Sequence, residues 1–443
     1  MNLFGTDGIR GKYWNYPLDD SFIQKIGFAL SKFFNGNIKR ILICQDGRES
    51  SLQIITKLLE GILSDRQYEI KYLGIFPTPS IPIILSENDK RDTVGIIITA
   101  SHNPYTDNGI KIFNGNGLKL SQAEELQVEK NIPETISIKP DISIQMVQDD
   151  SYRDIYSNKI TEIFNSKKKS SHKLNIAVDC ANGAMSEVIS TINFTNNINI
   201  NIFNNSPNGS NINDRCGAVC PEQLSEIVSN HNKNNEKTSI DFGICFDGDG
   251  DRAVIINSVG EILDGDDLLY LFSIYTNDIK KVVGTVMTNF GIRKNLNLNG
   301  IKFVETDVGD KNVLEAVKKN NCLIGTESSG HIVRNDIIQI PIGDALVTMI
   351  KFIHLLYDID KNIYDVYPKS LKVPSMLINV ETSSPDILIN NNKSKFTKVE
   401  KILQKDGRIL VRKSGTQSMI RILIEHESED LLQEAKEVID TLS

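Results

Sequence analysis

Short apolar runs rich in β-branched residues alternate with helix-like patterns along most of the chain. The run ILIC at residues 41–44 precedes SLQIITKLLEGILS at 51–64, in which leucine and isoleucine recur at helical spacing. Further apolar runs end in small or polar turns, as in LNIAVDCANGA, DFGICFDGDGD and VVGTVMTNFGI. This alternation predicts an α/β architecture, and the repeated units of strand and loop indicate related domains.

The chain has 443 residues, which is too long for a single hydrophobic core, since domains commonly hold roughly 100 to 200 residues. Changes of pattern favour divisions near residues 150, 255 and 368, giving the ranges 1–150, 151–254, 255–367 and 368–443. The alternation of Asn and Ile at 197–202 has the period of a strand. The last range ends in a predicted strand, SMIRILIE, and a capped amphipathic helix in SEDLLQEAKEVIDTL.

Acidic residues outnumber basic ones, 57 against 49, and the formal net charge is −8. Such a chain is not expected to bind nucleic acid or an anionic membrane through bulk charge. No apolar run suggests a signal peptide or a membrane span. The six scattered cysteines fit reduced thiols better than a disulfide framework. We therefore expect a soluble cytoplasmic protein without nucleic-acid or membrane partners.

Three aspartates alternate with glycine after a β-rich run, as Asp247, Asp249 and Asp251 in FDGDGDRA. Alternate residues of an extended loop point the same way, so the carboxylates are expected to converge. Convergence is costly unless a cation lies among them, and hard oxygen ligands suit Mg²⁺. An ordinary acidic turn is the alternative, because Asp-Gly is common turn chemistry. An EF-hand is excluded, since Arg252 and Ser258 stand where its loop requires glycine and glutamate.

The apolar run GIIITA ends in Ser101 and His102, which places a hydroxyl next to an imidazole. Ligands of α/β proteins bind beyond strand ends. The glycines of a G-x-S-x-G elbow are absent, which argues against an acyl-transfer triad. Taken alone, the pair also fits ordinary polar surface. A phosphorylated Ser101 would instead supply oxygens that complete a Mg²⁺ site with the three aspartates.

A third loop, GTESSGHIV, carries Glu327, Ser329 and His331 between glycines. Carboxylate, hydroxyl and imidazole groups offer donors and acceptors suited to sugar hydroxyls. An ordinary polar loop is the alternative interpretation.

A fourth loop, VRKSGTQ, carries Arg412, Ser414, Gly415 and Thr416 just before a predicted strand. Arginine makes bidentate contacts to phosphate, while hydroxyls and an exposed backbone add donors. The loop lacks the Walker A pattern. A basic turn is the alternative.

Together these loops resemble the motifs of the α-D-phosphohexomutase superfamily, most closely those of its bacterial branch that acts on glucosamine phosphate. The resemblance covers essentially the whole chain, in order, through FGTDGIRG, TASHNPYTDNGIK, DCANGA, PNGSNIN, FDGDGDR, VGDKNVLE, GTESSGH and RKSGTQSMIR. It implies four domains in a heart-shaped arrangement around a central cleft. Three would be related α/β domains, and the fourth a smaller C-terminal α+β domain.

The resemblance also implies a role for each candidate residue. Ser101 would be a phosphoserine that exchanges its phosphoryl group. The ligands of Mg²⁺ would be Ser101, Asp247, Asp249 and Asp251. The groups that stabilise charge or move protons would be Arg10, His102, Lys111 and Arg252. The sugar would be bound by Glu327, Ser329 and His331. The non-reacting phosphate would be bound by Arg412, Ser414, Gly415 and Thr416.

The implied reaction interconverts glucosamine 6-phosphate and glucosamine 1-phosphate through a hexosamine 1,6-bisphosphate that also serves as activator, toward UDP-N-acetylglucosamine and cell-wall synthesis. Superfamily members of this kind are monomers or homodimers. The chain departs from the family pattern at Lys311-Asn312, where Arg-Tyr is usual, and at Gln417-Ser418, where Glu-Pro is usual.

Three other interpretations stay open at this point. A phosphomannomutase or phosphoglucomutase of the same superfamily would share the catalytic groups. A phosphatase would use Asp247 and Asp249 as nucleophile and acid, with no role for Ser101. A non-catalytic paralogue would bind sugar phosphates without phosphoryl exchange.

Overall fold

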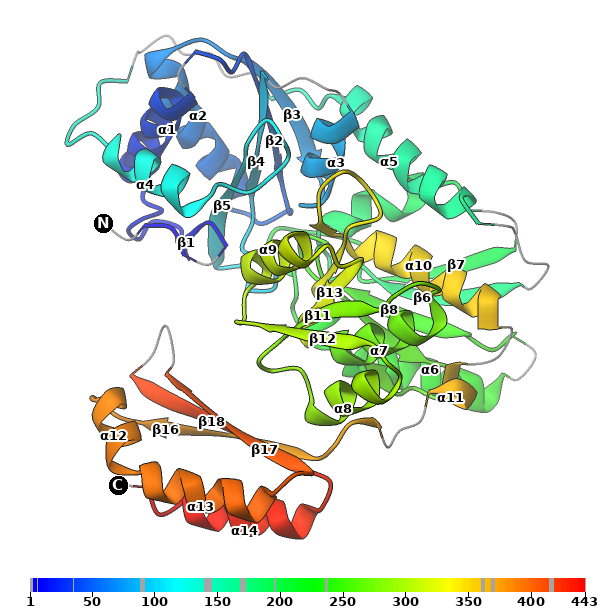
Figure 1. Ribbon diagram of the computed structural model, residues 1–443. Helices are drawn as coiled ribbons and strands as arrows, with labels where there is room; N and C mark the ends of the chain where they lie inside the picture. Colours follow the sequence, from blue (N-terminus) through cyan, green and yellow to red (C-terminus); the bar gives the residue numbers. More distant parts are fainter. Residues whose placement is uncertain are drawn as a thin grey trace.

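The structure is a computed structural model, and it describes residues 3–5, 7–34, 36–87, 92–138, 146–167, 173–194, 197–235, 238–359, 363–367, 371–413 and 418–442. Within these ranges the chain forms three five-stranded sheets and one three-stranded sheet. Figure 1 shows three α/β units packed together and a smaller C-terminal unit at the lower left. The predicted fold class, three related α/β domains and a C-terminal α+β domain, is confirmed.

The first sheet has the order β1-β5-β4-β2-β3, with β3, β2 and β4 parallel and β5 and β1 antiparallel. Its strands are β1 (Ile9–Lys12), β2 (Arg40–Gln45), β3 (Glu69–Ile75), β4 (Thr93–Ile98) and β5 (Asp107–Phe113). Its helices are α1 (Asp20–Phe34), α2 (Ser51–Asp65), α3 (Ser80–Glu87) and α4 (Gln122–Lys130). Helices cover both faces of this sheet (Figure 1), so β4 is buried along its whole length, which explains its unbroken apolar run.

The second and third sheets repeat this arrangement: three parallel strands followed by two antiparallel ones, in the orders β7-β6-β8-β9-β10 and β12-β11-β13-β14-β15. The strands of the second sheet are β6 (Leu174–Asp179), β7 (Ile198–Phe203), β8 (Phe242–Phe246), β9 (Ala253–Asn257) and β10 (Ile262–Leu263). Those of the third are β11 (Lys281–Thr285), β12 (Lys302–Thr306), β13 (Ile324–Thr326), β14 (Ile332–Arg334) and β15 (Ile342–Gly343).

Helices fill the connections of these two sheets. The α-helices are α5 (Asp150–Asn165), α6 (Glu222–Asn234), α7 (Gly265–Tyr275), α8 (Phe290–Leu298), α9 (Asp310–Asn320), α10 (Ala345–Ile359) and α11 (Ile363–Val366). The described residues also form the short 3₁₀ helices η1 (Ala184–Glu187), η2 (Ile189–Thr191) and η3 (Gly217–Val219). Among the described residues, no helix combines the length and the apolar character needed to cross a membrane.

Equivalent loops carry the three candidate motifs of these units. In each sheet the last parallel strand turns back into an antiparallel neighbour: β4 into β5, β8 into β9, and β13 into β14. We call these connections the reversal loops. They contain residues 99–106, 247–252 and 327–331 in turn. The fold therefore places the serine, the aspartates and the predicted sugar-binding residues at the same position of three repeated units.

The C-terminal unit pairs three antiparallel strands in the order β16-β18-β17. Its elements are β16 (Ser375–Glu381), α12 (Pro385–Asn391), α13 (Lys393–Leu403), β17 (Gly407–Lys413), β18 (Met419–His426) and α14 (Glu429–Ile439). The predicted strands at 41–44 and 197–202 and the predicted helix at 51–64 are likewise confirmed, as β2, β7 and α2. The expected cap of α14 is wrong, because the Ser428 side chain makes no capping hydrogen bond.

One hydrophobic core runs through the first three units, whereas the C-terminal unit has a separate core. Phe76 of the first unit packs edge to face on Tyr156 of α5 at 5.5 Å between ring centroids. The C-terminal unit attaches through polar contacts instead. The side chain of Asn289 at the start of α8 donates to the Val373 carbonyl (3.0 Å) and accepts from the Val373 amide (3.0 Å). The division expected near residue 255 falls inside β9, and the domain boundaries stay a prediction.

Asp344 is a buried residue whose pKa predicts how the free energy of unfolding changes with pH. It caps α10 by accepting from the amides of Leu346 and Val347, and it accepts from the Tyr156 hydroxyl. Burial raises its pKa to about 6, above the value of 3.8 in the unfolded chain. The native state therefore binds more protons between these two values, so the free energy of unfolding falls as pH rises through this window, by about 3 kcal/mol in total.

In Asp344→Asn this pH-dependent loss should be absent, because the amide keeps an acceptor oxygen but does not ionise. Calorimetric unfolding of both proteins between pH 4 and pH 8 tests this. The variant should gain stability relative to the wild type as pH rises. A difference that is constant over this pH range would contradict the assignment.

Candidate active site

Ser101 lies at the end of β4, where the first reversal loop begins. Its side chain is buried, and its backbone adopts a left-handed conformation with φ of 53°. The hydroxyl donates to Oδ2 of Asp247 at 2.7 Å, and Nδ1 of His102 lies 3.3 Å from Oγ of Ser101. The structure thus brings the predicted nucleophile of the first unit against the acidic loop of the second.

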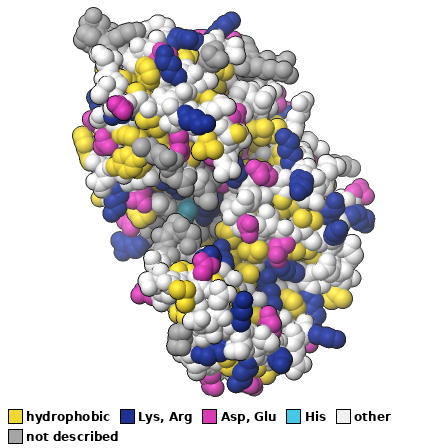
Figure 2. All heavy atoms as spheres, turned by 60° about the vertical axis from the view of Figure 1, so that its left-hand side comes forward, with side chains coloured by type: hydrophobic (Ala, Val, Ile, Leu, Met, Phe, Trp, Pro, Cys, Tyr) yellow, Lys and Arg dark blue, Asp and Glu magenta, His cyan; other side chains and the backbone are white. Residues whose placement is uncertain are grey.

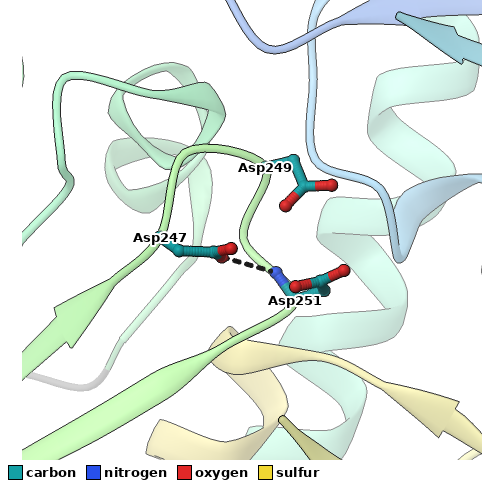
Figure 3. Close-up of side chains that lie close together, drawn as sticks. All are labelled: Asp247, Asp249 and Asp251. Atoms are coloured by element: carbon teal, nitrogen blue, oxygen red, sulfur yellow. Dashed lines mark hydrogen bonds between the residues drawn. The ribbon is translucent and has the colours of Figure 1, made fainter. Parts of the chain in front are cut away.

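The three aspartates converge as the sequence predicted (Figure 3). One oxygen of each of Asp247, Asp249 and Asp251 lies within 4.8 Å of the others, and all three residues are buried. Oδ1 of Asp247 accepts the amide of Asp251 at 3.1 Å, which holds the turn in shape. Burial and the charges of Asp251 and Asp249 raise the pKa of Asp247 well above its ordinary value. A third negative charge is therefore costly in this cluster unless a cation lies beside it.

The donor set suits a divalent cation. Within the described part of the chain, Oδ1 of Asp249 and Oδ1 of Asp251 are buried and have no hydrogen-bond partner. Buried acceptors without partners are costly, and a bound cation would satisfy them. Three carboxylates next to a serine hydroxyl form the all-oxygen set that Mg²⁺ prefers when it also binds phosphate. The predicted Mg²⁺ site is therefore consistent with the geometry.

A buried lysine borders the acidic loop. Nζ of Lys111, on β5, lies 2.8 Å from Asp249, 3.2 Å from Asp251 and 2.8 Å from Asp7. Burial opposes its charge, but the carboxylates outweigh burial and the pKa of Lys111 lies well above its ordinary value. Lys111 is therefore a permanent cation beside the acidic loop.

Two arginines and a histidine complete this side of the site. Arg10 on β1 donates to the carbonyl of Ala100 at 2.9 Å. Nε of Arg252 lies 4.0 Å from Asp247 and 4.0 Å from Asp251. Burial, Arg252 and Arg10 together lower the pKa of His102 to about 4. His102 is therefore neutral at neutral pH and is able to accept a proton.

The third reversal loop contacts the second through backbone interactions. Arg252 and His331 form an isolated antiparallel bridge, and the amide of Ala253 donates to the Gly330 carbonyl at 2.9 Å. Glu327 and His331 are buried, whereas Ser329 is exposed. Glu327 accepts the amide of Gly309 at 2.8 Å. The structure therefore brings the predicted sugar-binding residues next to the acidic loop.

The fourth predicted loop is described only in part. Arg412 lies on β17, directly opposite Arg421 on β18. Burial and the charge of Arg421 lower the pKa of Arg412, and an anion bound there would relieve this repulsion. Ser414, Gly415 and Thr416 lie outside the described residues, as does Gln417.

Figure 2 shows a hollow at mid-height of the molecule with a histidine side chain inside it. A large cavity next to the site lies between the N-terminal segment, α4 and the start of α9. Its volume is about 780 Å³, and Asp7, Arg10, Glu125, Lys311 and Asn312 line it. Lys311 pairs with Glu125 at 3.2 Å. The unusual Lys311-Asn312 pair thus lies where the first unit meets the third, outside the acidic loop.

Sequence reasoning missed two residues that connect these groups. Oδ2 of Asp7 pairs with Lys111 at 2.8 Å and with Arg10 at 2.7 Å, and Lys119 bridges Asp7 to Asp310 of α9. Burial opposes the charge of Asp7, but the cations Lys111 and Lys119 outweigh it and hold its pKa well below the ordinary value. Asp7 stands inside the motif FGTDGIRG, which was the available signal, whereas Lys119 had none.

A buried serine, a cluster of three aspartates and a polar loop beside them, drawn from three repeated α/β units, form the arrangement expected of a multidomain sugar-phosphate mutase. Models of one protein family match all four parts of the chain. Phosphoglucomutase/phosphomannomutase alpha/beta/alpha domain I matches residues 1–138, domain II matches 154–260, domain III matches 264–372 and the C-terminal domain matches 377–442.

Curated relatives narrow the assignment. The chain is 36% identical over 445 residues to the phosphoglucosamine mutase of Coxiella burnetii, covering 98% of this chain and 97% of that protein. It is 33% identical over 450 residues to that of Ruthia magnifica subsp. Calyptogena magnifica, covering 100% of this chain and 99% of that protein. This chain belongs to the phosphoglucomutase/phosphomannomutase family, in its phosphoglucosamine mutase branch, and is an isomerase.

Solved structures share the fold over nearly the whole chain. A phosphoglucomutase/phosphomannomutase family protein from Burkholderia thailandensis has a TM-score of 0.76 at 19% identity, covering 99% of this chain and 96% of that chain. The Aspergillus fumigatus N-acetylphosphoglucosamine mutase, in complex with GlcNAc-6P and magnesium, has a TM-score of 0.65 at 17% identity, covering 100% and 96%. At these identities the likeness concerns the fold alone.

Proposed function

We propose that this protein interconverts glucosamine 6-phosphate and glucosamine 1-phosphate through a phosphoserine at residue 101. The observation that carries the proposal is the buried Ser101 hydroxyl, 2.7 Å from Asp247 in an aspartate cluster fit for Mg²⁺. The names of the curated relatives support the amino sugar. The Aspergillus fumigatus N-acetylphosphoglucosamine mutase, which shares the fold, is itself in complex with GlcNAc-6P and magnesium.

In the proposed mechanism the bond between phosphorus and Oγ of Ser101 breaks while a sugar hydroxyl oxygen attacks the phosphorus. The hydroxyl proton passes to a base, for which we propose His102, because it lies beside Ser101 and its lowered pKa leaves it unprotonated at neutral pH. Lys111, Arg10 and Arg252 stabilise the charge of the transferring group. Mg²⁺, when bound by Asp247, Asp249, Asp251 and the Ser101 phosphate, would neutralise negative charge on that group.

The product of this half-reaction is a hexosamine 1,6-bisphosphate, which would also serve as the activator. After it turns round, Oγ of Ser101 takes up the other phosphoryl group. Glu327, Ser329 and His331 would bind sugar hydroxyls in either orientation. Arg412, with Ser414, Gly415 and Thr416, would bind the phosphate that is not reacting. The separate core of the C-terminal unit supports this part, because a movement of that unit to suit both orientations would leave the core of the other three units intact.

We place this activity in the cytoplasm, in the supply of UDP-N-acetylglucosamine for cell-wall synthesis. All six cysteines are free, which fits a reducing compartment. The assembly is proposed to be a monomer or a homodimer, with a phosphosugar as small-molecule partner.

Substrate preference is tested by phosphorus NMR of the protein with Mg²⁺ and a trace of the matching hexose 1,6-bisphosphate. Glucosamine, glucose and mannose 6-phosphates are compared in parallel. We expect glucosamine 6-phosphate to be converted fastest to its 1-phosphate. Preference for glucose or mannose would keep the mechanism and change the substrate. Release of free phosphate alone would favour a phosphatase, and the absence of any conversion would favour a binding paralogue.

A further inference from the structure

A fully buried ion pair follows β2 and lies beneath the first reversal loop. Nε of Arg48 is 2.8 Å from Oδ2 of Asp46, and neither side chain is exposed to solvent. Burying two charges is costly, and well-packed apolar residues often replace such a pair without loss of stability. The pair therefore calls for an explanation beyond stability of the core.

The remaining nitrogens of Arg48 bind the backbone of the serine loop. Nη2 donates to the carbonyls of Ser101 and Asn103, each at 2.9 Å. Nη1 donates to the carbonyl of Asp107 at 2.9 Å and also to that of Pro104. One planar guanidinium thus binds four carbonyls between residues 101 and 107.

Asp46 is connected to the backbone amide of Ser101 through the side chain of Thr99. The Thr99 hydroxyl donates to Oδ2 of Asp46 at 2.6 Å, and the Ser101 amide donates to the Thr99 oxygen at 2.8 Å. The contacts form a closed ring: Ser101 amide, Thr99, Asp46, Arg48 and Ser101 carbonyl. We call this set the Asp46–Arg48 ring. Both backbone polar groups of Ser101 end on the same buried ion pair.

The conformation of Ser101 explains why such a ring is needed. A left-handed φ is strained in a residue other than glycine, and it persists where surrounding contacts over-determine it. Here φ is 53°. Asn213, from the second unit, adds a bond from Nδ2 to the Ser101 carbonyl at 2.9 Å. In this conformation the hydroxyl reaches Asp247.

We infer that Asp46, Arg48 and Thr99 are positioning residues for phosphoryl transfer, because their ring holds Ser101 in the strained conformation that aims its oxygen at the aspartate cluster. The inference rests on the proposed role of Ser101. None of the three side chains would touch substrate. Their effect would act on the rate of phosphoryl transfer and much less on sugar binding.

Thr99→Val is the main test, since valine keeps the shape of threonine and removes only the hydroxyl that closes the ring. Thr93→Val is the matched control, at the opposite end of β4, where Thr93 is also buried and bonds only to the neighbouring Asp92 among the contacts described. The readouts are kcat, KM, the phosphorus NMR signal of phosphoserine and the melting temperature.

For Thr99→Val we expect kcat to fall about 10- to 100-fold, as a small misplacement of a reacting group does, while KM changes less than about threefold. Thr93→Val should keep the wild-type kcat, with a melting temperature similar to that of Thr99→Val. A wild-type kcat in Thr99→Val would overturn the inference, and so would an equal loss of kcat in both variants.

Arg48→Lys is an independent test of the ring. Lysine keeps the positive charge of arginine but lacks the planar guanidinium that binds several carbonyls at once. It should lose more kcat than Thr99→Val. If Arg48→Lys does not fold, Thr99→Val still decides. Failure of the proposed function and failure of the positioning role give different results. A wild-type protein without phosphoryl exchange on any sugar phosphate would refute the proposed function. An active wild type with a fully active Thr99→Val would refute only the positioning role.

Discussion

Replacement of Ser101 by alanine is expected to lower mutase turnover by at least about four orders of magnitude, since the nucleophile itself is removed. The fold should persist, because alanine occupies less space at this buried position and the loop keeps its bonds to Arg48 and Asn213. Turnover of glucosamine 6-phosphate, followed by phosphorus NMR with the bisphosphate present, measures the effect. The phosphoserine signal should vanish in the same sample.

Ser86→Ala is the matched control, a serine on α3 whose hydroxyl bonds only to the Ile83 carbonyl among the contacts described. It should retain full turnover. If Ser101→Ala also retained turnover, the phosphoserine mechanism would be wrong. Phosphate release that continued unchanged in Ser101→Ala would point instead to the phosphatase reading of Asp247 and Asp249.

Asp249→Asn is expected to reduce turnover by about 100- to 1000-fold at moderate Mg²⁺ and to raise the Mg²⁺ concentration needed for activity. The substitution removes one of three clustered carboxylates and also a partner of Lys111 at 2.8 Å. Turnover against Mg²⁺ concentration measures the first effect. Calorimetric titration of the protein with Mg²⁺, without substrate, measures binding directly.

Asp154→Asn is a control of the same chemistry, because Asp154 is an exposed residue of α5 away from the cluster. It should leave the Mg²⁺ requirement unchanged. If Asp249→Asn bound Mg²⁺ as tightly as the wild type and kept its turnover, the metal assignment would be refuted.

Local spacing accounts for what the sequence predicted. Asp247, Asp249 and Asp251 converge because they alternate on one short loop, and Ser101 is presented by a strand end. The contacts that complete the site join residues far apart along the chain. Lys111 meets Asp249 across 138 positions, and Arg48 meets the Ser101 carbonyl across 53. No periodicity relates such pairs, so Asp7, Lys119 and Arg48 emerged only from the structure.

The correspondence between the reversal loops of the three α/β units also could not be predicted from the sequence. The sequence indicated repeated strands and loops, but it did not show that Ser101, Asp247 and Glu327 stand at corresponding reversals of three sheets. That correspondence depends on which strands pair, and strand pairing is a property of the folded chain.

The three reversal loops amount to a division of labour. Under the proposed mechanism, one repeat would supply the nucleophile, the next the site for its counter-ion, and the third the groups that bind the sugar, each at the corresponding position of the same scaffold. Under these proposed roles, a change confined to the loop between β13 and β14 would alter which hexose is accepted while the sheets and the phosphoryl chemistry stay intact. Diversification of substrate would then involve about five residues, 327–331, and no change of the scaffold.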